Sequence, residues 1–282
     1  MVKEDGCLYL VGTPIGNLED ISLRAVRILT EADLIACEDT RETLKLLNHL
    51  GISKKMISYQ KYSENEKKGH LIDLVEAGNK IALVSDAGMP GISDPGEILV
   101  REAWDRGVRV EVIPGPSAVI SGLVISGLPT NNFYFHGFLP KGKVKEREAV
   151  VTGLKDIRAT LIFYITPHSV EKDLLLLLKI LGDRPAAIAR ELTKYYEEVI
   201  RGTLSELLTV VGERTLKGEM VLIIEGNSEV ISELGLEEQY KIYLKMLSDG
   251  VKSKEVLKTI STDYKVSKNR LYEYILGKKE NN

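Results

Sequence analysis

Residues 81–96 read Ile-Ala-Leu-Val-Ser-Asp-Ala-Gly-Met-Pro-Gly-Ile-Ser-Asp-Pro-Gly, and this stretch decides the fold class. An apolar run over 81–85 has the length of a buried strand, and a loop of Gly, Pro and Asp follows it directly. An amphipathic run over 96–105 comes next and stops at Gly107, as helices commonly do. Strand, rigid turn and helix in this order predict a βαβ unit and a mainly parallel sheet.

The same order repeats on both sides of this stretch. It predicts further strands over 8–12, 34–37, 56–59 and 108–113, and helices over 21–29, 42–50 and 65–77. Asp20 is the expected N-cap of the first helix. We therefore expect an N-terminal α/β domain over 1–120 with a parallel-rich sheet.

The pattern changes after Gly127. Predicted strands now span 133–138, 160–165, 185–190, 197–201 and 220–225, and the clearest helices span 170–181 and 204–212. Such spacing is typical of antiparallel pairing. It predicts a second α/β domain over 121–227 with a mixed sheet, followed by a polar, acidic linker over 227–238.

The remaining residues, 239–282, form a separate electrostatic unit. The chain carries a net charge of -3, but from Lys241 onward ten basic residues face five acidic ones, and the preceding part has 28 against 36. Three short helices over 240–247, 252–261 and 267–276, with Ser253 and Ser267 as expected N-caps, resemble a helix-turn-helix. The cations expected to contact RNA phosphates include Lys252, Lys254, Lys258, Lys265, Lys268, Arg270, Lys278 and Lys279. The alternative is a solvated surface on a small helical cap.

Composition excludes the membrane and disordered classes. Hydrophobic residues make up 44% and charged residues 28%, and the first residues do not make a signal peptide. We expect a cytoplasmic protein. Cys7 and Cys37 lie inside predicted strands without a CxxC or a nearby His, so buried thiols are expected and no metal site is predicted.

Three Gly- and Pro-rich loops follow predicted strands, over 12–17, 86–96 and 114–118. The carboxyl ends of parallel strands meet at one edge of a sheet, where ligands bind. Glycine allows close backbone approach and proline stiffens a loop, so together these loops predict a rigid backbone cradle, although each alone would suit a tight turn. Glu38 and Asp39 follow the first loop by about 20 residues, as in a dinucleotide site, but the G-x-G-x-x-G fingerprint is absent. A nicotinamide enzyme is therefore a weak alternative.

Several motifs resemble the ribosomal RNA small subunit methyltransferase I family, which shares the wider tetrapyrrole methylase fold. They cover nearly the whole chain, and span 10–20 (LVGTPIGNLED), 36–41 (ACEDTR), 83–96 (LVSDAGMPGISDPG), 113–118 (IPGPSA), 135–140 (FHGFLP), 189–194 (ARELTK) and 217–221 (KGEMV). One loop departs from the family pattern: residues 164–169 read Tyr-Ile-Thr-Pro-His-Ser where the family usually has Tyr-Glu-Ser-Pro-His-Arg. The paired loss of an acid and a base predicts that this loop makes a dispensable local contact.

The resemblance implies an α/β, two-domain, tetrapyrrole-methylase-like fold with a small helical extension. It also implies an S-adenosylmethionine-dependent enzyme, a homodimer, that methylates the ribose 2'-hydroxyl of a cytidine in the decoding region of 16S rRNA, in the small ribosomal subunit. The cofactor contacts that it implies are Pro14, Gly88, Met89, Ile92, Ser117, Ala118, Tyr164, Ala187 and Met220.

Proton transfer from a ribose hydroxyl calls for a base. Our hypothesis is that Asp39 or Glu38 takes the proton while Arg41 holds a phosphate; for Asp39 the equally weighted alternative is a helix N-cap. Asp86 is a further acid of the cradle, and Asp94 is assigned to turn formation.

Other polar residues have two interpretations each. His136 is a possible base or RNA contact, but a lone histidine is more often a packed residue. Arg190, Glu191 and Lys194 form an ion network or contact RNA phosphates; the network is favoured for Glu191 and the phosphate contact for Lys194. The rival functions are a tetrapyrrole or diphthamide-pathway methyltransferase and a non-catalytic RNA-binding ribosome-assembly protein.

Overall fold

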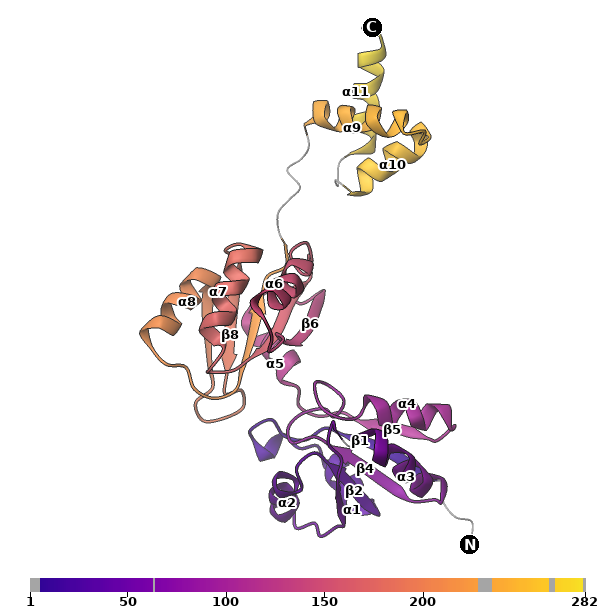
Figure 1. The fold of residues 1–282 in the computed structure, drawn as a ribbon, viewed down its shortest axis with the longest axis vertical. Coiled ribbons are helices and arrows are strands. Elements are labelled where there is room, and N and C mark those ends of the chain that lie inside the picture. The colour runs from indigo at the N-terminus through magenta and orange to yellow at the C-terminus, as the bar shows by residue number, and fades with distance from the viewer. Residues whose placement is uncertain (1–5, 63, 228–234, 264–266, 281–282) are drawn as a thin grey trace. The chain divides into compact units, whose positions relative to one another are not determined.

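The structure, a computed structural model, describes residues 6–62, 64–227, 235–263 and 267–280. It divides into two compact units, Met1–Asn227 and Ser228–Asn282. The first unit contains two five-stranded sheets, and the second contains three helices (Figure 1). No helix among the described residues is long and apolar enough to cross a membrane.

The first sheet is entirely parallel, as predicted, with strand order β3-β2-β4-β1-β5. Its strands are β1 (Cys7–Val11), β2 (Leu34–Cys37), β3 (Met56–Ser58), β4 (Lys80–Val84) and β5 (Val110–Ile113). The connecting helices are α1 (Leu23–Glu31), α2 (Thr40–His49), α3 (Glu64–Glu76) and α4 (Glu97–Asp105). Apolar side chains of α1 and α2 pack with one set of strand residues, and those of α3 and α4 pack with another, so the sheet is buried on both faces.

The start of the first helix was predicted wrongly. Residues Leu18–Asp20 form a short 3-10 helix, and α1 begins only at Leu23. Ser22 is the N-cap in place of Asp20, because its side chain accepts a hydrogen bond from the amide of Ala25 at 3.0 Å. The preceding turn is held in the same way by Asn17, whose side chain accepts from the amide of Glu19.

The second sheet is mixed, with strand order β6-β7-β10-β8-β9. Only β6 and β7 are parallel, and the other neighbours are antiparallel. Its strands are β6 (Phe133–Phe138), β7 (Thr160–Ile165), β8 (Pro185–Arg190), β9 (Glu198–Thr203) and β10 (Met220–Ile224). A bulge between Phe135 and Gly137 interrupts the register of β6.

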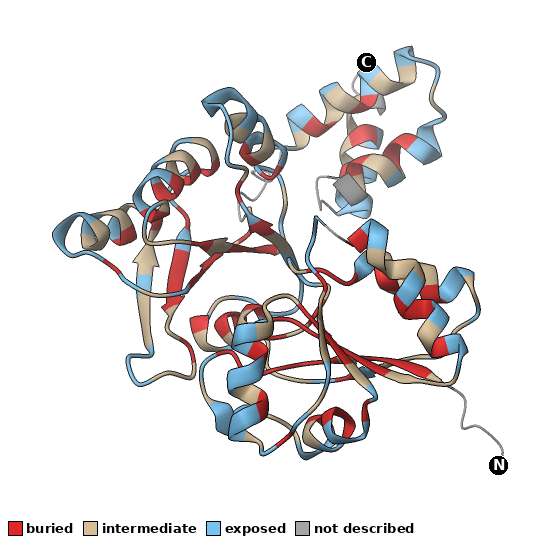
Figure 2. Ribbon diagram, turned by 60° about the horizontal axis from the view of Figure 1, so that its bottom comes forward, coloured by how far each residue is buried: buried red, intermediate tan, exposed pale blue. Residues whose placement is uncertain are grey.

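Helices cover both faces of this second sheet. One face packs against α6 (Val144–Gly153), α7 (Val170–Leu181) and α8 (Leu204–Glu213), and the other against α5 (Ala118–Ser126). Buried residues gather on the strands of both sheets and on the helix sides that face them (Figure 2). The helix α5 directly follows the last Gly/Pro loop of the first sheet and packs on β8 and β10, so it connects the two halves of the unit.

The second unit has its own small core. Helices α9 (Leu236–Ser248), α10 (Ser253–Asp263) and α11 (Lys268–Glu280) bury Tyr243, Val256, Leu257, Ile260, Leu271 and Ile275. The predicted N-cap Ser267 accepts a weak hydrogen bond from the amide of Arg270 at 3.4 Å. Most of the predicted linker, 228–234, and Lys265 lie outside the described residues.

Candidate active site

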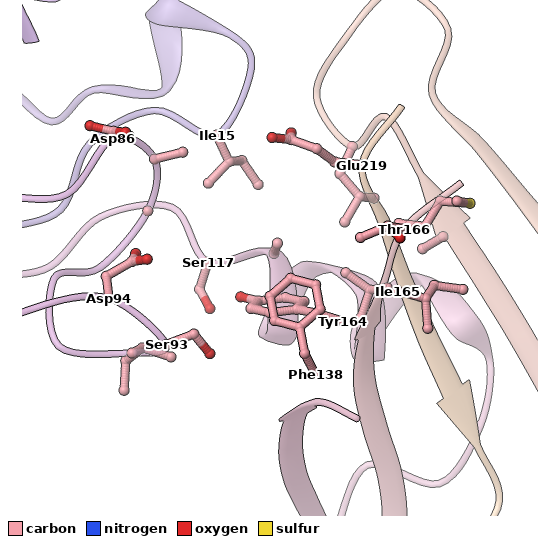
Figure 3. Close-up of a pocket in the computed structure, with 18 of the residues that line it drawn as sticks. Ile15, Asp86, Ser93, Asp94, Ser117, Phe138, Tyr164, Ile165, Thr166 and Glu219 are labelled. Carbon is pink, nitrogen blue, oxygen red and sulfur yellow. The ribbon is translucent and has the colours of Figure 1, made fainter. Parts of the chain in front are cut away.

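A cavity of about 450 Å³ lies where the two halves of the first unit meet. The loops after β2, β4 and β5 form one wall, and residues of β7, β8 and β10 with their loops form the other (Figure 3). Its lining comprises Ile15, Glu38, Asp86, Ala87, Gly88, Met89, Ile92, Ser93, Asp94, Ser117, Ala118, Phe138, Tyr164, Ile165, Thr166, Pro167, Ala189, Leu192, Gly218, Glu219, Met220 and Val221.

The three Gly/Pro loops come together as predicted. The amide of Thr13 donates to the carbonyl of Gly88 at 2.9 Å, and the amide of Gly88 donates back to the carbonyl of Thr13 at 3.1 Å. Gly12 touches Gly115 of the third loop, because a Cβ at Gly12 would lie 2.7 Å from the backbone of Gly115. The loops are therefore packed backbone on backbone, which only glycine allows.

Two hydrogen bonds from backbone amides anchor the loop after β4. The amide of Gly91 donates to the carbonyl of Pro95 at 3.1 Å, and the amide of Gly96 donates to the buried carboxylate of Glu64 at 2.9 Å. Between these two anchors Ser93 adopts a φ of 66°, a left-handed conformation that is uncommon for residues other than glycine. The anchored loop presents Ile92, Ser93 and Asp94 to the cavity.

The opposite wall is mainly apolar and aromatic. The ring of Tyr164 packs edge-on against Phe135 at 5.0 Å between centroids and tilted against Phe138 at 5.3 Å. Burial, with the nearby Asp94 and Glu219, raises the pKa of Tyr164 to about 12. Its hydroxyl therefore stays protonated at neutral pH and can donate a hydrogen bond.

Four carboxylates line the cavity: Glu38, Asp86, Asp94 and Glu219. Burial and the carboxylates of Glu38 and Asp86 raise the pKa of Asp94 to about 6. Burial followed by neighbouring acids also raises the pKa of Glu38 and of Asp86, although the amide of Asp39 donates to Asp86 at 3.0 Å. The first-sheet side of the cavity is thus acidic and suits a cation.

Asp39 is placed as a helix cap. Its carboxylate accepts from the amide of Arg41 at 2.8 Å and from the guanidinium at 2.6 Å, and it is the N-cap of α2. These bonds lower the pKa of Asp39 to about 2. Neither Asp39 nor Arg41 lines the cavity, whereas Glu38 does. The N-cap interpretation of Asp39 is therefore confirmed.

Most of the predicted cofactor residues lie together. Gly88, Met89, Ile92, Ser117, Ala118, Tyr164 and Met220 all line the cavity. Pro14 and Ala187 do not; Pro14 is buried in the first loop, and Ala187 is fully buried in β8, where Ala189 lines the cavity instead. The role of each as a cofactor contact stays a prediction.

Sequence reasoning missed other lining residues, above all those of the departing loop and of the turn before β10. Ile165, Thr166 and Pro167 reach the cavity, so this loop lines the site despite its unusual sequence. Gly218 and Glu219 line it as well. The signal for them was the Lys-Gly-Glu segment before an apolar strand, which by itself suits any tight turn.

Lys194 lies in an ion network at the edge of the cavity. Its ammonium contacts Glu191 at 3.0 Å and Glu219 at 2.9 Å, and its side chain packs along Gly16. The network expected for Glu191 is confirmed, with Lys194 as its partner. The phosphate contact expected for Lys194 stays a prediction.

His136 is a packed residue. Its ring lies 5.5 Å from that of Phe163 and 6.1 Å from that of Tyr134, and burial lowers its pKa. It does not line the cavity.

Five of the cations predicted on the helical unit lie on its surface. Lys252, Lys254, Lys258, Lys268 and Arg270 are exposed, whereas Lys278 lies 3.5 Å from Glu237. Lys252 and Lys254 stand at the start of α10, and Lys268 and Arg270 at the start of α11. This unit therefore offers two groups of cations that a polyanion can reach.

Comparison with known proteins defines the class. The model of the tetrapyrrole (corrin/porphyrin) methylases matches residues 7–208, and the chain belongs to this family. The fold resembles diphthine synthase (TM-score 0.63, 19% identity, 78% of this chain and 90% of that one) and a uroporphyrin-III-C-methyltransferase from Thermus thermophilus (TM-score 0.55, 21%, 77% and 94%).

Within the family, the similar curated proteins are named ribosomal RNA small subunit methyltransferase I. The protein of Halalkalibacterium halodurans is 48% identical over 95% of this chain and 94% of its own length. The protein of Bacillus subtilis is 42% identical over 95% of this chain and 93% of its own length. The Thermotoga maritima protein is 43% identical, and the match covers 78% of this chain and 99% of that protein. The chain is thus a methyltransferase of this branch.

Methyltransferases of this family use S-adenosylmethionine as methyl donor. The cavity fits such a molecule. Its acidic side suits a sulfonium charge, its apolar wall suits the adenine ring, and the closely packed glycine loops leave main-chain groups near the surface.

Proposed function

We propose that this chain methylates the 2'-hydroxyl of a cytidine in the decoding region of 16S rRNA. The observation that carries the proposal is the identity of 42–48% over most of the chain to proteins named for the small-subunit ribosomal RNA. The cavity supports it, because it joins a place for a cationic methyl donor to a set of carboxylates that can accept a proton.

The residues of the chain act mainly by binding and orientation. Gly88, Met89 and Ser117 would hold the donor, which supplies an electrophilic methyl group when bound. Tyr164 and Phe138 would exclude water from the reacting atoms. Because methyl transfer requires an in-line approach, the loops anchored to one another contribute by fixing the geometry.

The helical unit would provide RNA affinity. Its exposed cations, which include Lys252, Lys254, Lys258, Lys268 and Arg270, suit the phosphates of a folded RNA, which supply most of the sequence-independent binding energy. We assign this unit to substrate binding and not to the chemical step, because every residue that lines the cavity belongs to the first unit. We further propose that the protein is cytoplasmic, where small ribosomal subunits are, and that it acts as a homodimer. Exposed apolar side chains on β5 and α5, Val112, Ile120 and Val124, support the dimer.

The test uses labelled S-adenosylmethionine with three acceptors: small ribosomal subunits, naked 16S rRNA and a tetrapyrrole precursor. We expect label in the subunits, at a ribose that becomes resistant to alkaline cleavage. Label in the tetrapyrrole alone would favour the rival methylase function. Donor binding without transfer to any acceptor would favour a non-catalytic assembly protein.

A further inference from the structure

We propose that Asp94 is the general base that accepts the proton of the attacking ribose hydroxyl. This inference rests on the proposed function and replaces two earlier assignments, Asp39 as base and Asp94 as a turn-forming residue. It is drawn from where the structure places the carboxylates of the site.

Asp39 is poorly suited to the role. Its oxygens accept hydrogen bonds from the amide and guanidinium of Arg41, and it does not line the cavity. A carboxylate held by these bonds is a weak base. If the Asp39 side chain turned to a substrate, it would break the cap of α2.

Asp94 has the opposite surroundings. It lines the cavity beside Ser93, and in Figure 3 its carboxylate and the Ser93 and Ser117 hydroxyls occupy the side opposite Tyr164 and Phe138. The backbone on both sides of Asp94 is fixed, by the bond between Gly91 and Pro95 and by the bond from Gly96 to Glu64. A base in this position is preorganised and does not depend on loop movement.

The groups that face Asp94 tune its basicity. Glu38 at the end of β2 and Asp86 at the end of β4 add negative charge, and with burial they raise its pKa to about 6. Tyr164 of β7 faces it as a neutral hydroxyl whose pKa is raised by burial and by the charges of Asp94 and Glu219. Asp94 is therefore mostly ionised at pH 7 to 8 and is a stronger proton acceptor than an ordinary carboxylate, as a general base should be.

In the proposed step a methyl group moves from sulfur to oxygen and one proton is released. The ribose oxygen forms a bond to the methyl carbon while the methyl–sulfur bond breaks, and the electron pair of that bond stays on sulfur, which becomes a neutral thioether. The hydroxyl proton moves to the Asp94 carboxylate and later leaves to solvent. No oxidant, metal ion or further reactant enters this balance.

The experiment compares wild type with Asp94→Asn, Asp94→Glu and the control Asp105→Asn, an exposed aspartate at the end of α4. The rate constant kcat for methylation of small ribosomal subunits is measured from pH 5 to 9 at saturating donor and subunits, and donor affinity is measured separately by calorimetry. We expect Asp94→Asn to bind the donor within about threefold of wild type and to lose a factor of about 100 or more in kcat. The wild-type rise in kcat with an apparent pKa near 6 should vanish in Asp94→Asn, persist in Asp94→Glu and be unchanged in Asp105→Asn.

Several outcomes would overturn the proposal. These are a wild-type kcat in Asp94→Asn, persistence of the same pH dependence in that variant, or loss of its donor binding, which would make Asp94 a binding group. If Asp94→Asn does not fold, the Asp94→Glu variant tests the proposal. If Asp94 is the base, Asp94→Glu must keep the rise of kcat with pH. If the wild-type protein does not methylate an RNA ribose, the proposed function itself is contradicted. The wild-type reaction alone shows this, so it is distinguishable from a failure of the Asp94 proposal.

Discussion

The backbone amide of Gly96 donates a hydrogen bond of 2.9 Å to the carboxylate of Glu64, 32 positions earlier in the chain. Glu64 is only 5% exposed, and Gly96 is the residue before α4. The bond joins the first turn of α3 to the start of α4 and fixes the end of the loop that carries Asp94. The buried side chain of Glu64 supplies the acceptor that this amide at the start of a helix would otherwise lack.

Removing this carboxylate should affect both stability and the site. We expect Glu64→Ala to lower the free energy of unfolding by about 2–3 kcal/mol, since it leaves a buried amide without an acceptor. Glu64→Gln keeps an acceptor oxygen and should lose less than half of that. Chemical denaturation measures both, with the exposed Glu66→Ala of the same helix as control. Equal losses in the alanine and glutamine variants would contradict an acceptor role.

The stability of an Asp94 variant should depend on pH. The pKa of Asp94 is raised from 3.8 to about 6, so the folded state holds this proton more tightly than the unfolded state. Folded-state stability due to this group is therefore lost as pH rises from about 4 to 6. Asp94→Asn avoids this loss and should be more stable than wild type by about 1–2 kcal/mol at pH 8, allowing for partial exposure, with little difference below pH 4.

Thermal unfolding across this pH range measures the difference between the two proteins. A gain in Asp94→Asn that is the same at pH 4 and pH 8 would show that its origin is not the titration of Asp94.

The glycine contact at the base of the cradle should not tolerate a methyl group. A Cβ at Gly115 would lie 2.8 Å from the backbone of Gly12. We expect Gly115→Ala to cost about 1–3 kcal/mol of stability and to weaken donor binding at least tenfold, because the two loops must separate. Gly69→Ala is the matched control: Gly69 is helical with nothing within 4 Å, and alanine there should stabilise by about 0.5–1 kcal/mol. Wild-type donor affinity in Gly115→Ala would contradict the cradle.

The cations of the helical unit should determine how RNA binding responds to salt. Replacing Lys252, Lys254, Lys258, Lys268 and Arg270 by Gln should weaken binding to small ribosomal subunits and make the slope of log K against log salt less steep by about 2–4. Donor affinity should not change. Lys278→Gln, whose ammonium lies near Glu237, should have a smaller effect. An unchanged slope in the fivefold variant would place the RNA-binding surface elsewhere.

The parallel sheet was predictable because its strands are short apolar runs, and because β1, β4 and β5 lead into loops rich in Gly, Pro or Asp. The helix α5 was not predicted, for a physical reason. It is almost entirely apolar, since it packs on the second sheet while it begins at the cavity, and it shows no amphipathic period. Its N-cap Ser117 was interpreted only as part of a Gly/Pro loop.

The site was predictable where backbone conformation needs special residues, as at Gly12, Gly88 and Gly115. The role of an ordinary side chain was not predictable where contacts with other parts of the fold determine that role. Asp39 and Asp94 both follow strands and precede helices, and only the partners decide between them: Arg41 for the first, and Glu38 and Asp86 for the second. Arg41 is close to Asp39 in the sequence, but Glu38 precedes Asp94 by 56 positions, and sequence spacing contains no information about so distant a partner.

The bulge in β6 determines what the wall around Tyr164 is made of. In a regular strand, residues three apart point to opposite faces, yet Phe135 and Phe138 both pack against the Tyr164 ring. The additional residue thus resets the alternation of β6 halfway along its length. A one-residue deletion within 135–137 would therefore restore the regular alternation and turn one of the two aromatic rings away from Tyr164.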